Sequence, residues 1–265
     1  MPDIYANGIR HAYTLRGDGP PLVLIAGMGG AASYWTPQLD PFAARRRVLT
    51  YDQRATGNTE RVPVRDIAQL ADDLLALLDA LDIECADLVG HSTGGAIAQV
   101  IAARHPERVR SQVIFASVHR ADAYRRRVWG LRKAILQHMG PEVYAQTTSL
   151  FFYPPEYVAG HDAALAEVER RAAQGEIPSP DLMASRIDAI LDFDISSELG
   201  NVRAPTLVCC AEDDMLTPAY FSREIAQAIS GADLVLWRSG GHAYSRSNPD
   251  AFNRLVLDFL DQQDR

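Results

Sequence analysis

Residues 86–94 read Ala-Asp-Leu-Val-Gly-His-Ser-Thr-Gly, a short apolar run that leads into a serine flanked by glycines. The apolar part, residues 86–90, is typical of a buried strand. Residues 94–104 follow with a helical pattern, which His105-Pro106 ends. Gly-x-Ser-x-Gly between a strand and a helix is the nucleophile-elbow pattern, in which a strained turn exposes a serine hydroxyl. The alternative is a glycine-lined turn in which Ser92 only caps the helix.

Strand and helix patterns alternate on both sides of this stretch. Strands are predicted at 21–26, 47–51, 86–90, 109–116, 206–211 and 233–237, and helices at 64–81, 94–104, 219–229 and 250–260. Ahead of them, residues 4–6 and 9–15 flank Asn7-Gly8 and predict an antiparallel hairpin at the sheet edge. This alternation predicts an α/β fold with a mostly parallel, eight-stranded sheet that helices cover on both faces.

The alternation stops between residues 118 and 200, where the pattern is helical and rich in aromatic residues. A segment of this length is too long for a plain loop. We therefore expect an inserted helical cap at 118–200, and a core domain built from 1–117 and 201–265.

Composition limits the classes of function. The 265 residues carry 26 basic and 34 acidic side chains, a net charge of −8, which argues against a nucleic-acid binder. The most apolar run, 20–28, is far below the ~20 residues that a spanning helix needs. Residues 1–5 do not resemble a signal peptide, and three cysteines make no disulfide framework. We expect a cytoplasmic protein without a membrane partner, and leave a homodimer open.

A nucleophilic serine needs a base, which in the elbow pattern follows an acid farther along the chain. Of the seven histidines, His242 comes after Ser239-Gly240-Gly241, just past the last predicted strand. Three acidic residues, Glu212, Asp213 and Asp214, follow the strand at 206–211. We predict Asp214 as the acid and keep Asp213 as the alternative.

The oxyanion of such a reaction must also be held. Ala26-Gly27-Met28-Gly29-Gly30 follows an early strand, and we predict the N–H groups of Met28 and Thr93 as donors, each worth about 2.7–4 kcal/mol. The alternative is a glycine loop without a role. Phosphate-loop spacing and metal-ligand spacing are both missing from the sequence, so we predict no cofactor and no metal.

The cap and its surroundings supply the candidates for contact with a small-molecule substrate. These candidates are Trp35, Trp129, His138, Phe151, Phe152, Tyr153, Phe193 and Tyr244. The alternative for many of these side chains is packing inside the cap.

Over nearly its whole length the sequence resembles the α/β-hydrolase superfamily. The resemblance rests on 25–30, Ser33-Tyr34-Trp35, 51–57, the elbow at 90–94, Asp214 before Thr217-Pro218, and Gly241-His242. Two positions depart from the family pattern: Ala26 stands where histidine is usual, and Ala55 where glycine is usual. The resemblance implies an α/β-hydrolase fold with Ser92, Asp214 and His242 as the catalytic triad.

A closer resemblance is to the aminoacrylate/carbamate hydrolase family of the Rut pyrimidine-degradation pathway. It is carried by Pro37-Gln38-Leu39 and, in the cap, by 150–154, 186–189 and 194–196. It implies a serine hydrolase that cleaves a small ester, lactone, amide or carbamate. The alternatives are an activity like that of the similar 3-oxoadipate enol-lactonases or a general carboxylesterase. A lyase, a cofactor-free haloperoxidase and a non-catalytic binding protein are less favoured, the last because the chain keeps all three triad residues.

Overall fold

The computed structural model describes residues 1–264, apart from the side chain of Glu176. Its sheet has eight strands in the order β1-β2-β4-β3-β5-β6-β7-β8. The strands are β1 (Asp3–Ala6), β2 (Ile9–Arg16), β3 (Pro21–Ile25), β4 (Arg47–Tyr51), β5 (Ala86–His91), β6 (Val109–Phe115), β7 (Thr206–Ala211) and β8 (Asp233–Trp237). Only the pairs β1–β2 and β2–β4 are antiparallel. The predicted sheet, with its antiparallel hairpin at one edge, is confirmed.

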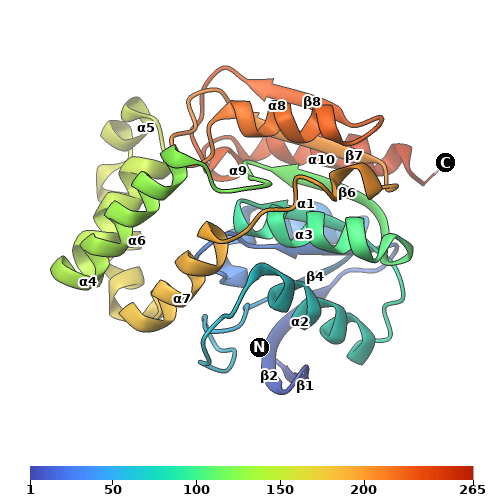
Figure 1. Ribbon diagram of the computed structural model, residues 1–265, viewed down its shortest axis with the longest axis horizontal. Coiled ribbons are helices and arrows are strands. Elements are labelled where there is room, and N and C mark those ends of the chain that lie inside the picture. Colours follow the sequence, from blue (N-terminus) through green and yellow to red (C-terminus); the bar gives the residue numbers. More distant parts are fainter. Residues whose placement is uncertain (265) are drawn as a thin grey trace.

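Helices cover both faces of the sheet (Figure 1). One face is covered by α2 (Ile67–Ala80), α3 (Thr93–Arg104) and α8 (Ala219–Ala228), whose apolar side chains share one core cluster. The other face is covered by α1 (Thr36–Ala43) and α10 (Pro249–Gln262), which share a second cluster. Short helical turns complete the core at η1 (Ala32–Trp35), η2 (Pro106–Arg108), η4 (Leu199–Asn201) and α9 (Tyr244–Ser247). Because both faces are covered, the central strands are apolar on both sides.

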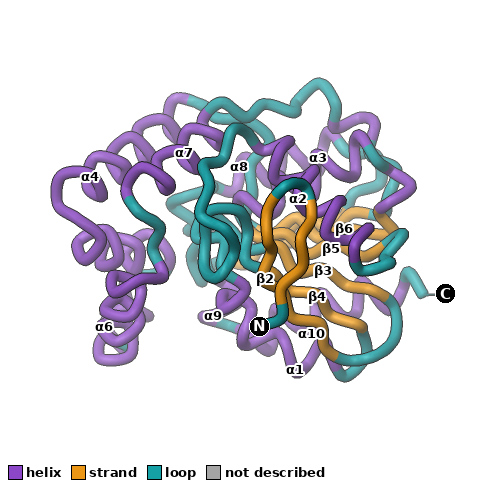
Figure 2. The backbone as a smooth tube through the Cα atoms, turned by 90° about the horizontal axis from the view of Figure 1, so that it is seen from below, coloured by secondary structure: helices purple, strands orange, loops and turns teal. Residues whose placement is uncertain are grey.

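The remaining helices lie between β6 and β7 in the chain and form the cap. They are α4 (Ala123–Phe152), α5 (Pro155–Gly160), α6 (Asp162–Arg171), the π-helical turn η3 (Ala172–Glu176) and α7 (Pro180–Leu191). Figures 1 and 2 both show α4 and α6 beyond one end of the strands. All of them fall within residues 118–200, the range of the predicted insertion.

Helix α4 is broken rather than continuous. Gly140 has φ 85° and ψ 178°, a conformation that side-chain-bearing residues rarely adopt, and Pro141 follows it. The break lets the two segments of α4 approach each other, and Arg132 Nη2 donates to Thr148 Oγ1 at 2.8 Å across it. Neither this break nor helix α1 was predicted from the sequence.

Within residues 1–264, none of the helices combines the length and the apolar character that crossing a membrane requires.

Candidate active site

Ser92 occupies the turn between β5 and α3 in a strained backbone conformation, with φ 54° and ψ −117°. Positive φ is costly for a residue with a side chain and is tolerated where the surroundings enforce it. The flanking glycines explain how the turn fits. A Cβ on Gly90 would collide with the backbone of Gly94 and Gly95, and a Cβ on Gly94 would collide with the carbonyl of Ile25. The structure therefore has the strand–turn–helix geometry of a nucleophile elbow.

His242 lies in the loop after β8 and is bound to a buried carboxylate. Its Nδ1 is 2.8 Å from Asp214 Oδ2, and both side chains are almost fully buried. The other Asp214 oxygen accepts the N–H groups of Leu216 and Thr217 at 2.7 and 2.8 Å. Burial alone would raise the pKa of Asp214, but the charge of His242 and the donated hydrogen bonds outweigh it and lower that pKa. Asp214 is thus an ionised partner for His242.

Asp213, the alternative acid, has a different position. Its carboxylate accepts the N–H groups of Gly240 and Gly241 at 2.9–3.2 Å and the hydroxyl of Ser239 at 2.6 Å. Asp213 thereby fixes the loop that carries His242, whereas Asp214 contacts the imidazole itself.

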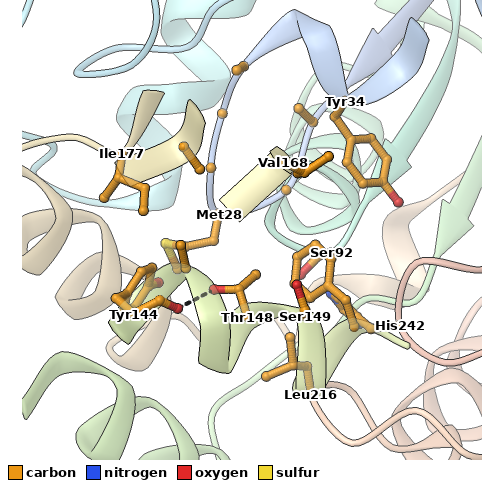
Figure 3. Close-up of a pocket in the computed structure, with 18 of the residues that line it drawn as sticks. Met28, Tyr34, Ser92, Tyr144, Thr148, Ser149, Val168, Ile177, Leu216 and His242 are labelled. Carbon is orange, nitrogen blue, oxygen red and sulfur yellow. Dashed lines mark hydrogen bonds between the residues drawn. The ribbon is translucent and has the colours of Figure 1, made fainter. Parts of the chain in front are cut away.

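Ser92 and His242 line the same cavity, of about 210 Å³, between the sheet and the cap. Figure 3 shows both side chains on one side of it, with Ser149 of α4 nearby. His91 steadies this arrangement because its Nε2 lies 3.0 Å from the carbonyl of His242. The ring of His91 also stacks on Tyr34, with 4.4 Å between ring centroids.

The loop after β3 brings one of the two predicted oxyanion donors, Met28, to the cavity. Met28 lines it, and Thr93 is the first residue of α3, where N–H groups have no intrahelical partner. Among the described residues, no hydrogen bond uses the N–H of Met28 or of Thr93. Both N–H groups are thus free to donate, and their role as oxyanion donors stays a prediction.

Arg186 of α7 holds this loop from the cap side. Its Nε donates to the carbonyl of Met28 at 2.8 Å, and its Nη1 donates to the carbonyl of Arg54 at 2.8 Å. Its Nη2 donates to Gln53 Oε1 at 2.6 Å, and Gln53 in turn donates to the carbonyl of Ala26. Burial lowers the pKa of Arg186 to about 10, so the guanidinium is still charged at neutral pH. Arg186 fell within one of the quoted cap matches, but the sequence did not reveal this role.

Three of the predicted substrate-binding residues, Trp129, Phe152 and Tyr153, line the cavity. The other five do not, which corrects the prediction. Trp35 is fully buried and packs on Phe252 in the core, and Tyr244 stacks on Trp237 with 3.8 Å between ring centroids.

The remaining three lie away from the cavity for different reasons. Phe151 is not part of the cavity wall, and its ring packs against the guanidinium of Arg132. Phe193 packs against the core cluster under α2 and α3, and His138 is exposed at the surface.

Several cavity-lining side chains were missed by the sequence analysis, among them Tyr34, Arg132, Thr148, Ser149 and Leu216. Tyr34 could have been predicted from the sequence because it precedes Trp35 in one of the segments that resemble the family. Arg132 and Thr148 were not, because only the break in α4 brings them together.

Among residues 1–264, histidine, cysteine and acidic side chains do not gather in threes as a metal site would require.

Comparison with known proteins identifies the family. The family described as alpha/beta hydrolase fold matches residues 20–245. The chain is an α/β hydrolase. It is 39% identical over 266 residues to "Putative carbamate hydrolase RutD" of Azorhizobium caulinodans, with both chains fully covered. It is 38% identical over 248 residues to the protein of the same name from Pseudomonas syringae pv. syringae, covering 93% of this chain and 95% of the other.

The solved structure of the enol-lactonase from Burkholderia xenovorans LB400 has the same architecture as this α/β hydrolase. The TM-score is 0.90 at 29% identity, over 98% of this chain and all of the other. The predicted family resemblance is confirmed, and the protein is an enzyme of the hydrolase class.

Proposed function

We propose that this hydrolase forms an acyl-enzyme on Ser92 and cleaves a small carbamate, ester, amide or lactone. The observation that carries the proposal is the shared cavity of Ser92 and His242, where Asp214 binds the far nitrogen of the imidazole at 2.8 Å. An ionised carboxylate at Nδ1 favours the tautomer with its proton there, so Nε2 is free to act as a base.

The proposed reaction follows from this geometry. Ser92 Oγ attacks the carbonyl carbon while His242 Nε2 takes its proton. The N–H groups of Met28 and Thr93 bind the oxyanion. The tetrahedral intermediate then expels the amine or alcohol, which receives the proton from His242. Water, deprotonated by the same imidazole, attacks the acyl-enzyme and releases the acid and free Ser92.

The substrate class rests on the cavity and on the relatives. A cavity of about 210 Å³ favours a small substrate. Relatives at 33–39% identity, matched over 90% or more of their length, carry the name "Putative carbamate hydrolase RutD". A carbamate is therefore the first candidate. A lactone is the second, because the enol-lactonase structure matches nearly the whole chain.

Kinetics with a panel of phenyl carbamate, phenyl acetate and δ-valerolactone test the proposal. We expect turnover of at least one substrate, with a loss on the order of 10⁶ in kcat on Ser92→Ala. Ser230→Ala is the control, because Ser230 is exposed and lies outside the site. Turnover that survives Ser92→Ala would show that the reaction does not pass through Ser92.

A further inference from the structure

Helix α4 presents a polar patch to the cavity, formed by Arg132, Thr148 and Ser149. None of these residues has a part in the proposed acyl transfer. Ser149 and Thr148 lie on the cavity wall next to the region of Ser92 and His242 (Figure 3). Arg132 adjoins Thr148, to which its Nη2 donates at 2.8 Å.

The guanidinium of Arg132 is incompletely bonded. Its side chain is 2% exposed, and its Nε and Nη1 are buried without a hydrogen-bond partner among the described residues. These two atoms carry three N–H groups in total. A buried cation that lacks a counter-ion is costly, and an anion with acceptor oxygens relieves that cost.

Aromatic rings hold this guanidinium in place. Its central carbon lies 4.5 Å from the ring centroid of Tyr144, 5.1 Å from that of Phe151 and 5.2 Å from that of Trp129. Such rings stabilise the charge through their faces but accept no strong in-plane hydrogen bond. The rings therefore fix the cation and leave its N–H edge for another partner.

Besides Arg132 and His242, the ionisable side chains of arginine and glutamate that line the cavity are one cation and one carboxylate. Arg246 lines the cavity and is half-buried. Glu169 lines it as well, but is partly exposed and makes no ion pair with Arg132. Asp214 is occupied by His242, Leu216 and Thr217.

We propose that Arg132, with the hydroxyl of Ser149, binds a carboxylate of the substrate; the hydroxyl of Thr148 is already donated to the carbonyl of Tyr144 at 2.8 Å. The enzyme then acts on small acyl compounds that carry a carboxylate besides the bond to be cleaved. The guanidinium binds the carboxylate oxygens through charge-assisted hydrogen bonds, and the reacting carbonyl reaches Ser92 in the same cavity. This inference rests on the proposed function and restricts its substrate to a compound that carries a negative charge.

A matched pair of esters tests the charge preference. Monomethyl succinate carries a carboxylate, and dimethyl succinate has the same chain without a charge. We expect wild-type kcat/KM to be about tenfold to a hundredfold higher for the monoester, as a hydrogen-bonded charge would give. Arg132→Gln removes most of that ratio, chiefly by raising KM for the monoester. Arg127→Gln is the control, because Arg127 is exposed on the same helix, and it keeps the wild-type ratio.

A binding measurement on the wild type covers the case in which Arg132→Gln does not fold. Calorimetric titration with succinate and with succinamide compares a charged ligand with a neutral one and needs no turnover. Tighter binding of succinate, by about tenfold or more, is the expected result. Equal binding of the two, or equal kcat/KM for the two esters, overturns the carboxylate site and leaves the acyl-enzyme intact. Absence of acylation at Ser92 by either ester overturns the proposed function instead, while the titration still decides the carboxylate site.

Discussion

His91 shows how the surroundings of one side chain set its chemistry. It is buried beside the reacting groups, its ring stacks on Tyr34, and its Nε2 contacts the carbonyl of His242. Burial first, and then the charge of His242, hold the pKa of His91 well below its usual value. A neutral His91 with its proton on Nε2 donates to that carbonyl and helps to position the loop of the predicted base.

This lowered pKa makes stability depend on pH. Below about pH 6.5 the unfolded chain takes up a proton at His91 and the folded chain does not, so the free energy of unfolding falls as pH falls. We expect the wild type to lose about 1 kcal/mol more per pH unit between pH 6.5 and 5 than His91→Gln, which has no titrating group at this position. Urea unfolding of both proteins across this range measures the difference. Parallel pH dependences would contradict a neutral, buried His91.

At the scale of elements, helix α7 joins the cap to the loop after β3. Arg186 donates to the carbonyls of Met28 and Arg54 and to the side chain of Gln53. A cap helix thereby fixes the peptide chain whose N–H group, at Met28, is the proposed oxyanion donor. Arg186 acts on the reaction through this loop, so it is a positioning residue.

Replacing Arg186 separates positioning from binding. Arg186→Met leaves two buried carbonyls unpaired and frees the loop, and we expect kcat to fall by about tenfold to a hundredfold, short of losing an oxyanion donor outright. KM should change far less, and Arg186→Lys should restore part of the loss. Asp188→Asn is the control on the same helix, since Asp188 is exposed and pairs with Lys133. An effect on KM alone would assign Arg186 to substrate binding.

The sequence predicted the elements that are determined by residues close together in the chain. Strand and helix patterns and the elbow at residues 90–94 depend on neighbouring residues, and the structure agrees with them. The order of Ser92, Asp214 and His242 came from the family pattern. The cavity wall was harder to predict because Arg132 reaches Thr148 only through the break at Gly140. Aromatic character predicted cavity contact for Trp129, but Trp35 and Tyr244 pack in the core instead.

At the scale of the whole molecule, the two ends of the sheet carry different groups: the candidate catalytic residues at one end and buried ion pairs at the other. Ser92, Asp214 and His242 follow the carboxyl ends of β5, β7 and β8. The opposite end of β5 carries Asp87, which is fully buried, accepts the hydroxyl of Ser111 at 2.7 Å and binds Arg110. Arg46, also buried, lies 3.6 Å from Asp87 and extends the ion pairs to Asp261 and Asp264 beside the end of α10.

We therefore expect Asp87→Asn to affect stability and not the site. Arg46 keeps Asp261 and Asp264 and Arg110 keeps Asp264, but both lose the buried carboxylate of Asp87. The loss should cost about 1.5–3 kcal/mol of unfolding free energy in urea. Asp79→Asn, which breaks an exposed ion pair with Arg108, should cost less than about 1 kcal/mol. The folded Asp87→Asn protein should keep the wild-type reactivity of Ser92. A similar small cost for both variants would show that the buried ion pairs do not stabilise the fold.

The proposed mechanism depends on the reactivity of Ser92. The intact mass of the protein after treatment with a fluorophosphonate measures this reactivity directly. Wild type and Ser230→Ala should each gain the mass of one phosphonyl group, and Ser92→Ala should gain none. An adduct that persists on Ser92→Ala, or a wild type that stays unlabelled while it hydrolyses its substrate, would contradict an activated serine at this position.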